Sequence, residues 1–326
     1  MRALGTGLLP LLLACILSAS KSSGEISSLA ISPDAKLIAV EFEKGGRSFI
    51  YRISVDTGVA ARLTAAKDGV ESSPDFSPDG KRIAYTYWPA DHKRSRIVIV
   101  NVDGSDMRRW SPSTSSDFSP VFSPDNQTII FSRSEFYGRY SPIAQPHSHE
   151  WDFYAAKLDG TDPRRITSQS FYMVSPVSVS PDGKTIAAAT VGLESDSQIA
   201  VYSIDCPGKA KLTFQPHVPK EADHKNPILA YPNYTPDGAS ILFMAASNGR
   251  HGYDYDVYQL NLATSSVEKL TNENGYATDL KVSAGGRTAV FLKWHKSWLG
   301  DLTSNEIQLL DLRNRTLTPL KITGLD

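Results

Sequence analysis

The sequence predicts an all-β fold, namely a six-bladed β-propeller in which each blade is a four-stranded antiparallel sheet. Three observations predict this fold. A turn of the type Ser-Pro-Asp-Gly occurs in six copies, the copies start 45 to 57 residues apart, and alternating apolar residues flank them. A repeat of about 40–50 residues made of short strands is typical of propeller blades.

The clearest copy of the turn is Ser77-Pro78-Asp79-Gly80, whose residue types suit a type I turn. Serine can bond to nearby backbone, proline has its φ angle fixed, and glycine accepts the positive φ with which the chain returns as a strand. The remaining copies keep most of this chemistry. They are Ser32-Pro33-Asp34-Ala35, Ser123-Pro124-Asp125-Asn126, Ser180-Pro181-Asp182-Gly183, Thr235-Pro236-Asp237-Gly238 and the degenerate Ser283-Ala284-Gly285-Gly286.

Four strands fit into each repeat. Short turns such as Asp103-Gly104 and Asp159-Gly160 join the third strand to the fourth, and Asp-Gly is a strong hairpin signal. The expected strands are 26–31, 37–42, 49–55 and 60–64 in the first blade, 73–76, 82–88, 97–102 and 107–110 in the second, 120–122, 128–132, 153–158 and 164–167 in the third, 176–179, 185–191, 198–204 and 210–214 in the fourth, 231–234, 241–246, 256–262 and 267–271 in the fifth, and 279–282, 288–294, 306–312 and 316–322 in the sixth.

Prolines mark the first strand of several blades. Pro74, Pro120 and Pro232 lie four residues before the turn proline, and Pro176 lies five before it, which predicts a bulge in blade four. Proline is tolerated in a sheet only at an edge or a bulge, so these strands are expected to line the central channel. Because the first and last repeats both contain four strands, we expect the ring to close by packing of blade one on blade six, without an exchanged strand.

The composition is that of an ordinary globular protein, with 326 residues, 40% of them hydrophobic and 21% charged. The net charge of −1 provides no basic surface for nucleic acid, and we expect a monomer that binds none. The two cysteines, Cys15 and Cys206, do not encode a disulfide framework.

Residues 1–20 are predicted to be an export signal and residues 25–326 a single propeller. Arg2 precedes an apolar segment, 8–17, that is too short to span a bilayer as a stable helix. The signal is therefore expected to be cleaved.

Two endings of this signal are compatible with the sequence. The small residues 18–20 form a cleavage site that would release a soluble exported protein. The segment Leu-Leu-Ala-Cys at 12–15 resembles a bacterial lipobox, which would place a lipid on Cys15 and attach the protein to a membrane through that lipid alone. We expect a bacterial protein of the periplasm or an outer-membrane-associated lipoprotein.

The repeated Ser-Pro-Asp-Gly-Lys-x-Ile-Ala segment, found at 77–84 and 180–187, resembles the TolB-type, WD40-like propeller repeat. The closing strands at 61–64, 164–167 and 268–271 resemble it too, so the likeness covers nearly the whole chain after the signal. The resemblance implies a protein-binding role in the periplasm, as in TolB. Similar propellers also occur beside the hydrolase domain of prolyl oligopeptidase-like enzymes and in oligogalacturonate lyases. The chain departs from these patterns because it lacks the α/β domain of TolB and a hydrolase domain.

Strand order places the Ser-Pro-Asp-Gly and Asp-Gly turns on one face of the ring. The longer connections, at 89–96, 133–152, 215–229, 248–255 and 295–305, lie on the other face, and long loops on a rigid scaffold are where function concentrates. All seven histidines fall in these connections, together with aromatic residues of the kind that anchor interfaces. The candidates for contact with a ligand or partner are His92, His147, His149, Trp151, His224, His251, Tyr253, Tyr255, His295 and Trp298.

His147 and His149 are the strongest candidates for a metal-binding role. Residues two apart in an extended chain point to the same side, so both imidazoles could bind one divalent transition metal. His224 or His251 would complete such a site. The alternative is a surface loop with two solvated histidines. Oligogalacturonate lyases use a histidine-coordinated metal on such a face, as the resemblance implies, but none of their ligands can be matched to a residue of this chain.

Three aspartates, Asp75, Asp117 and Asp279, lie near the predicted inner strands. They would either make the mouth of the channel acidic or cap local backbone, and we expect capping.

The sequence favours an exported, non-catalytic scaffold whose long-loop face binds a protein or envelope partner. The alternative is a metal-dependent carbohydrate-active enzyme that resembles oligogalacturonate lyase and uses His147 and His149 as ligands. A third hypothesis is a small-ligand sensor at the channel mouth. No catalytic residue is assigned.

Overall fold

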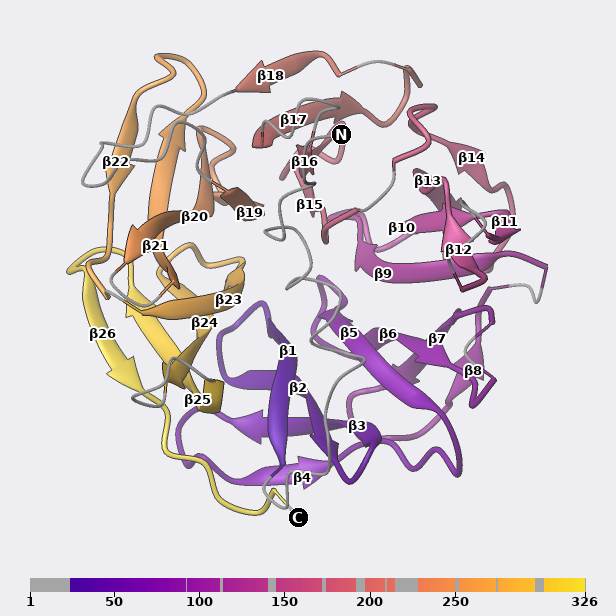
Figure 1. The fold of residues 1–326 in the computed structure, drawn as a ribbon, viewed down its shortest axis with the longest axis horizontal. Coiled ribbons are helices and arrows are strands. Elements are labelled where there is room, and N and C mark those ends of the chain that lie inside the picture. Colours follow the sequence, from indigo (N-terminus) through magenta and orange to yellow (C-terminus); the bar gives the residue numbers. More distant parts are fainter. Residues whose placement is uncertain are drawn as a thin grey trace, which may run out of the picture.

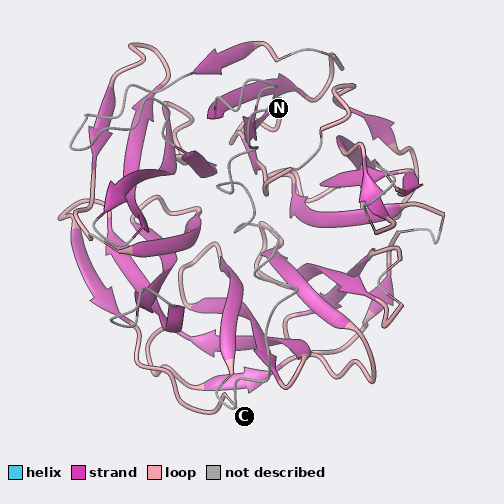
Figure 2. Ribbon diagram, in the orientation of Figure 1, coloured by secondary structure: helices cyan, strands magenta, loops and turns pink. Residues whose placement is uncertain are grey.

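The structure is a computed structural model that describes residues 24–91, 93–111, 114–139, 145–171, 174–191, 197–208, 210–214, 228–249, 252–273, 275–296 and 302–325. These residues form six four-stranded antiparallel sheets, arranged as blades around a central axis (Figure 1). The described chain consists of strands, turns and loops (Figure 2), and the predicted six-bladed propeller is confirmed. No helix in this part of the chain has the length and apolar composition needed to cross a bilayer.

The strands follow one another from the axis outward in every blade. Blade one contains β1 (Glu25–Ile31), β2 (Leu37–Lys44), β3 (Arg47–Ser54) and β4 (Ala60–Arg62), blade two β5 (Val70–Phe76), β6 (Arg82–Trp88), β7 (Arg96–Asn101) and β8 (Arg108–Arg109), and blade three β9 (Ser116–Phe122), β10 (Thr128–Ser134), β13 (Asp152–Lys157) and β14 (Arg164–Arg165). Blade four contains β15 (Ser178–Val179), β16 (Thr185–Val191), β17 (Ser197–Ser203) and β18 (Leu212–Phe214), blade five β19 (Ile228–Tyr234), β20 (Ser240–Gly249), β21 (Gly252–Asn261) and β22 (Val267–Lys269), and blade six β23 (Tyr276–Val282), β24 (Thr288–Lys296), β25 (Leu302–Asp311) and β26 (Thr316–Pro319).

The recurring turn has the predicted chemistry. The amide of Gly80 donates to the Ser77 carbonyl at 2.8 Å, and the Ser77 hydroxyl accepts from the Arg82 amide at 2.9 Å while it donates to Asp79. Gly80 has a φ of 69°, and the fourth residue of the other five copies has a φ between 58° and 71°. The turn therefore sets the register with which the second strand of each blade returns.

Bulges interrupt the first strand in five blades, as shifts of register within β1, β5, β9, β19 and β23. Ser73, Ser119 and Tyr231 have positive φ angles of 51°, 54° and 52° at these bulges, and each directly precedes a proline. The bulge predicted at Pro176 is not observed, because β15 begins only at Ser178 and pairs with β16 without a shift.

The connections predicted at 248–255 and 295–305 are wrong as loops, because much of each is strand. β20 and β21 remain paired as far as Gly249 and Gly252, and β24 and β25 remain paired as far as Lys296 and Leu302. An extra hairpin, formed by β11 (Phe136–Gly138) and β12 (His147–His149), lies within the predicted loop 133–152. Three hairpins thus extend blades three, five and six.

The hydrophobic core lies between the blades. Among the described residues, buried apolar side chains gather in six clusters, and each cluster combines residues of two neighbouring blades. In the cluster between blades one and six, for example, Ile38 and Val40 face Val290 and Leu292. The ring is therefore held together by the faces of its sheets.

The ring closes without an exchanged strand, as predicted, since β1–β4 and β23–β26 form separate sheets. Residues 320–325 add a contact that the sequence did not predict. The Ala60 amide donates to the Thr323 carbonyl at 2.8 Å, and the Thr323 amide donates to the Gly58 carbonyl at 3.0 Å. Leu320, Ile322 and Leu325 pack against the cluster between blades one and six, so this tail joins the two ends of the ring.

Candidate partner-binding face

The two ends of the ring differ in their connections. One end carries the Ser-Pro-Asp-Gly turns and the turns between third and fourth strands, and we call it the turn face. The other end, by strand order, carries the β11–β12 hairpin and the ends of the β20–β21 and β24–β25 hairpins, and we call it the hairpin face. The candidate residues of the sequence analysis that the structure describes belong to this second end.

The β11–β12 hairpin presents an aromatic side chain. Phe136 pairs with His149 across the hairpin, and its ring lies 4.5 Å from the His149 ring, measured between centroids. The Ser134 hydroxyl donates to the His149 carbonyl and accepts from the Phe136 amide at 3.2 Å, which fixes the base of the hairpin. Phe136 is 49% exposed, whereas His149 is 7% exposed beneath it.

The two histidines of β12 lie on the same side of their strand, as predicted. Their ring centroids are 5.6 Å apart, and the His147 Nδ1 atom is 3.0 Å from the Gln145 carbonyl. Within the described residues, no group of three histidine, cysteine or acidic side chains is placed to hold a metal ion. His92, His224, His251, Trp298 and Cys15 lie outside the described residues.

Two of the aromatic candidates are buried beneath the hairpin face. Trp151 is 9% exposed and packs on Phe118 at 6.0 Å between ring centroids. Tyr255 is 4% exposed and meets the Tyr276 ring edge-on at 5.4 Å. Both side chains therefore offer little surface to a partner.

The remaining described candidates lie in strands. Tyr253 is in β21, opposite Asn248 of β20. His295 is in β24, is half-exposed, and has its Nε2 atom 3.6 Å from the Glu306 carboxylate. Among the candidates in the described ranges, His147 and His149 have their rings close together, on one hairpin.

The aspartates near the inner strands bond to neighbouring elements rather than to local backbone. Asp75 accepts a hydrogen bond from the Phe122 amide of the next blade at 2.9 Å, and Asp279 accepts one from the Leu29 amide of blade one. Desolvation raises the pKa of both carboxyls to about 6, and the nearby ammonium group of Lys281 opposes the rise. These two aspartates thus link blade to blade, which corrects the expectation of local capping.

Asp117 differs from the other two because it is a buried partner of Arg133. The guanidinium approaches the carboxylate through two hydrogen bonds of 2.7 and 2.9 Å, both within blade three. Paired in this way, Asp117 adds no net negative charge to the channel.

The TolB beta propeller domain matches residues 17–219, which is more than half of the chain. The chain belongs to the TolB β-propeller family. Among curated TolB proteins, the Tol-Pal system protein TolB of Francisella tularensis subsp. mediasiatica (strain FSC147) is 26% identical over 243 residues, which cover 72% of this chain and 52% of that protein. The chain spans about half the length of the curated TolB relatives it matches.

Solved structures show the same TolB-like fold. The putative TolB from Agrobacterium tumefaciens superposes with a TM-score of 0.61 at 18% identity, covering 82% of this chain and 86% of that one. An oligogalacturonate lyase in complex with manganese superposes with a TM-score of 0.57 at 14% identity, covering 89% of this chain and 75% of that one. At such identities the likeness establishes the fold alone.

This TolB-like propeller also contains a buried carboxyl group that the sequence analysis did not single out. Glu41 of β2 is 3% exposed and accepts a hydrogen bond from the Ser28 hydroxyl at 2.7 Å. Burial raises its pKa to about 8, and the nearby carboxylates of Glu43 and Asp279 add to the rise. The sequence could have indicated this buried group, because Glu41 is the one acidic residue in the apolar segment 37–42.

Proposed function

We propose that this chain is an exported, non-catalytic TolB-like propeller that binds a protein partner in the bacterial cell envelope through its hairpin face. The observation that carries the proposal is the β11–β12 hairpin, which presents the half-exposed ring of Phe136 on a rigid ring of blades. Membership of the TolB family, with Tol-Pal system proteins among its relatives, supports the envelope location.

The hairpin is suited to binding because its aromatic side chain is held in place. Aromatic residues dominate the energetics of protein interfaces, and a preorganised side chain loses little conformational entropy when it binds. Phe136 rests on His149, and Ser134 bonds to both strands of the hairpin. A partner would therefore meet a fixed apolar contact.

The test is capture of envelope proteins by the purified chain with Phe136→Asp and a matched control, Val59→Asp. Val59 is 55% exposed but lies between β3 and β4 on the turn face. We expect Phe136→Asp to lower the affinity for the captured partner at least about tenfold, since loss of an anchor costs roughly 2 kcal/mol or more. Equal binding by both variants would show that the hairpin face is not the interface.

Export rests on residues 1–20, which lie outside the described residues. Cell fractionation of Cys15→Ser separates the two endings of the signal. Release of a membrane-bound form into the soluble periplasm is the result expected for a lipoprotein. An unchanged, soluble distribution indicates cleavage after residue 20, and retention in the cytoplasm of both forms contradicts export.

A second candidate function, a metal-dependent carbohydrate-active enzyme, is favoured by one observation, the 5.6 Å separation of the His147 and His149 rings. Two imidazoles at that separation could share a transition metal if further ligands came from other connections. Elemental analysis of the purified chain and of the double variant His147→Ala, His149→Ala tests it. A stoichiometric metal that the variant loses supports the enzyme, and no metal after loading rejects it.

A further inference from the structure

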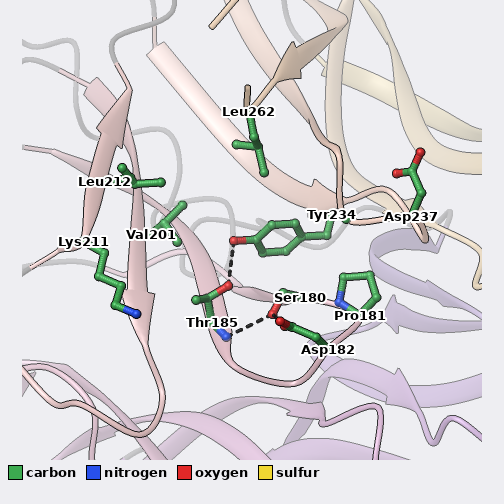
Figure 3. A pocket seen from close by; sticks show the side chains of 11 residues that line it. Ser180, Pro181, Asp182, Thr185, Val201, Lys211, Leu212, Tyr234, Asp237 and Leu262 are labelled. Atoms are coloured by element: carbon green, nitrogen blue, oxygen red, sulfur yellow. Dashed lines mark hydrogen bonds between the residues drawn. The ribbon is translucent and has the colours of Figure 1, made fainter. Parts of the chain in front are cut away.

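A pocket of about 650 Å³ opens on the turn face between blades four and five (Figure 3). The Tyr234 ring lies in its middle, with its hydroxyl 3.0 Å from that of Thr185. Lys211 and Leu212 lie on one side, the Ser180–Asp182 turn lies on the other, and Leu262 lies above the ring in this view. The pocket therefore combines an apolar interior with a charged rim.

At two other blade junctions, a side chain of one blade reaches a backbone carbonyl of the next. Between blades one and two, the Arg52 guanidinium donates to the Val102 carbonyl at 3.1 Å. Between blades two and three, the Trp110 indole N–H donates to the Leu158 carbonyl at 2.9 Å. In both cases a flat, donor-bearing side chain reaches from one blade to the carbonyl that follows the third strand of the next.

The register of the strands identifies the equivalent residues at the pocket. Val201 pairs with Ala187 in blade four as Arg52 pairs with Ala39 in blade one. The Leu262 amide donates to the Ala239 carbonyl as the Val102 amide donates to the Lys81 carbonyl, so the Leu262 carbonyl corresponds to that of Val102.

Valine at 201 neither fills the space nor donates a hydrogen bond, in contrast to the arginine of blade one. Within the described residues, no side chain donates to the carbonyl of Leu262. The space that Arg52 spans between blades one and two is therefore left open between blades four and five.

The inner rim of the pocket is acidic. The hydroxyl of Ser180 donates to Asp182 and that of Thr235 donates to Asp237, both at 2.6 Å, and these bonds hold the pKa of each carboxyl below its usual range. Both aspartates are therefore ionised at neutral pH.

Between blades two and three, a side chain of the next turn covers such a carboxylate. There the Asn126 side chain donates to Asp79 at 3.0 Å, but the residue equivalent to Asn126 at the pocket is Gly238, which has no side chain. The Asp182 carboxylate is therefore left uncovered by the next turn.

We propose that this pocket receives an arginine side chain from an extended segment of a partner protein, which completes the junction as Arg52 does between blades one and two. The guanidinium donates to the Leu262 carbonyl and to the two carboxylates of the rim, because a planar cation with five donors suits both kinds of acceptor. Its methylene groups pack on Val201 and Tyr234. Lys211 at the outer rim disfavours a second cation, so the segment carries a single arginine rather than a basic run.

The test is a nuclear magnetic resonance titration of the full chain with N-acetyl-arginine amide, with N-acetyl-citrulline amide as the neutral control of the same shape. We expect saturable shifts at the amides of Thr185, Tyr234, Gly238 and Leu262, with at least fivefold weaker binding of the citrulline compound. Val201→Arg supplies the missing filler from within the chain and is expected to abolish the shifts.

A second variant keeps the proposal falsifiable if Val201→Arg does not fold. The exposed pair Asp182→Asn, Asp237→Asn is expected to weaken binding of the arginine compound at least fivefold, whereas Asp34→Asn, Asp125→Asn in the equivalent turns is expected to leave it unchanged. Absence of saturable shifts in the parent chain overturns the proposal, as does equal binding of the arginine and citrulline compounds. Phe136→Asp leaves this titration unchanged, which separates the result from the test of the hairpin face.

Discussion

Single residues with positive φ determine where the chain turns in every blade. The turn residues are recognisable from sequence because each position requires a particular side chain, so the six turns could be predicted from local chemistry alone. The bulges were not predicted correctly. The one expected in blade four is absent, Pro74, Pro120 and Pro232 indicated edge strands rather than the bulges beside them, and blade six has a bulge at Asp279 without a proline.

Gly80→Val tests the turn at the scale of one residue. Gly80 has a φ of 69°, which a β-branched side chain resists, so we expect a loss of about 1 kcal/mol or more in the free energy of unfolding. Gly285→Val is the control, because an added side chain there meets nothing within 4 Å and the φ of Gly285 is not positive. Equal urea midpoints for the two variants would contradict the assignment.

The buried carboxyl groups predict how stability depends on pH. Glu41, Asp75 and Asp279 have pKa values raised to about 8, 6 and 6, so the folded chain holds protons that the unfolded chain releases. Their contribution is complete below about pH 4 and is lost as the pH rises through 6 to 8.

Glu41→Gln isolates the largest part of this effect. The amide is neutral at every pH, so we expect the variant to be more stable than the parent at pH 9 by on the order of 2 kcal/mol, and similar to it at pH 5. Thermal unfolding between pH 5 and 9 measures this, with the exposed Glu135→Gln as control. Parallel curves for Glu41→Gln and the parent chain would contradict it.

At the scale of the element, the parts of strands that pack on the core were predicted. The strand ends that extend beyond the sheets were not. The alternation of apolar residues that marks a strand comes from burial of one face. The ends of β20–β21 and β24–β25 project beyond the sheets, and polar residues such as Asp254 and Ser304 break the alternation there. The sequence therefore indicated loops where backbone pairing continues.

Asp152 shows how a blade fixes the end of its fourth strand. Its buried carboxylate accepts from the Thr167 hydroxyl at 2.6 Å, from the Gln169 and Ser170 amides at 2.8 and 3.2 Å, and from Arg165. Asp152→Ala would leave the buried Thr167 hydroxyl without its acceptor and release the two loop amides, so we expect a loss of about 1–3 kcal/mol in the free energy of unfolding.

Asp205→Ala is the matched control for that measurement. Asp205 also pairs with an arginine, Arg164, at 3.1 Å, but its side chain is 67% exposed. Exposed ion pairs contribute little, so we expect almost no change in the urea midpoint. A comparable loss in both variants would show that burial of Asp152 is not the cause.

For the whole molecule, residues 320–325 add a backbone contact to the closure of the ring by blades one and six. The sequence predicted the separate sheets of blades one and six, but it did not predict the tail, because a single bridge between Val59 and Thr323 leaves no periodic pattern. The pocket between blades four and five was hidden for a similar reason. It becomes visible only when Val201 is aligned with Arg52 through the strand register.

The geometry of the candidate site was predicted only in part. The proximity of His147 and His149 follows from the geometry of a strand, and it was predicted. The burial of Trp151 and Tyr255 was not, because it depends on packing against Phe118 and Tyr276, which are distant in the sequence.

Gly58→Ala tests the tail. An added methyl group at Gly58 would lie 1.8 Å from the Lys321 carbonyl oxygen, so the tail must move, and we expect a loss of about 1–3 kcal/mol beyond that of the control. The control is Gly45→Ala, which has a similar φ of 62° but meets nothing within 4 Å. Urea unfolding, together with proteolysis of the tail, distinguishes the two variants, and equal effects would contradict a role in closure.

The tail contact also determines when the edge of β4 can be paired during synthesis. Blade one leaves the ribosome first, yet the edge of β4 gains its partner only when residues 320–325 have been made. An unpaired strand edge is a template on which another chain can pair, so this edge of the nascent chain is open to intermolecular association until residues 320–325 have emerged. Chaperone dependence of this propeller should therefore track the time between the emergence of these two segments.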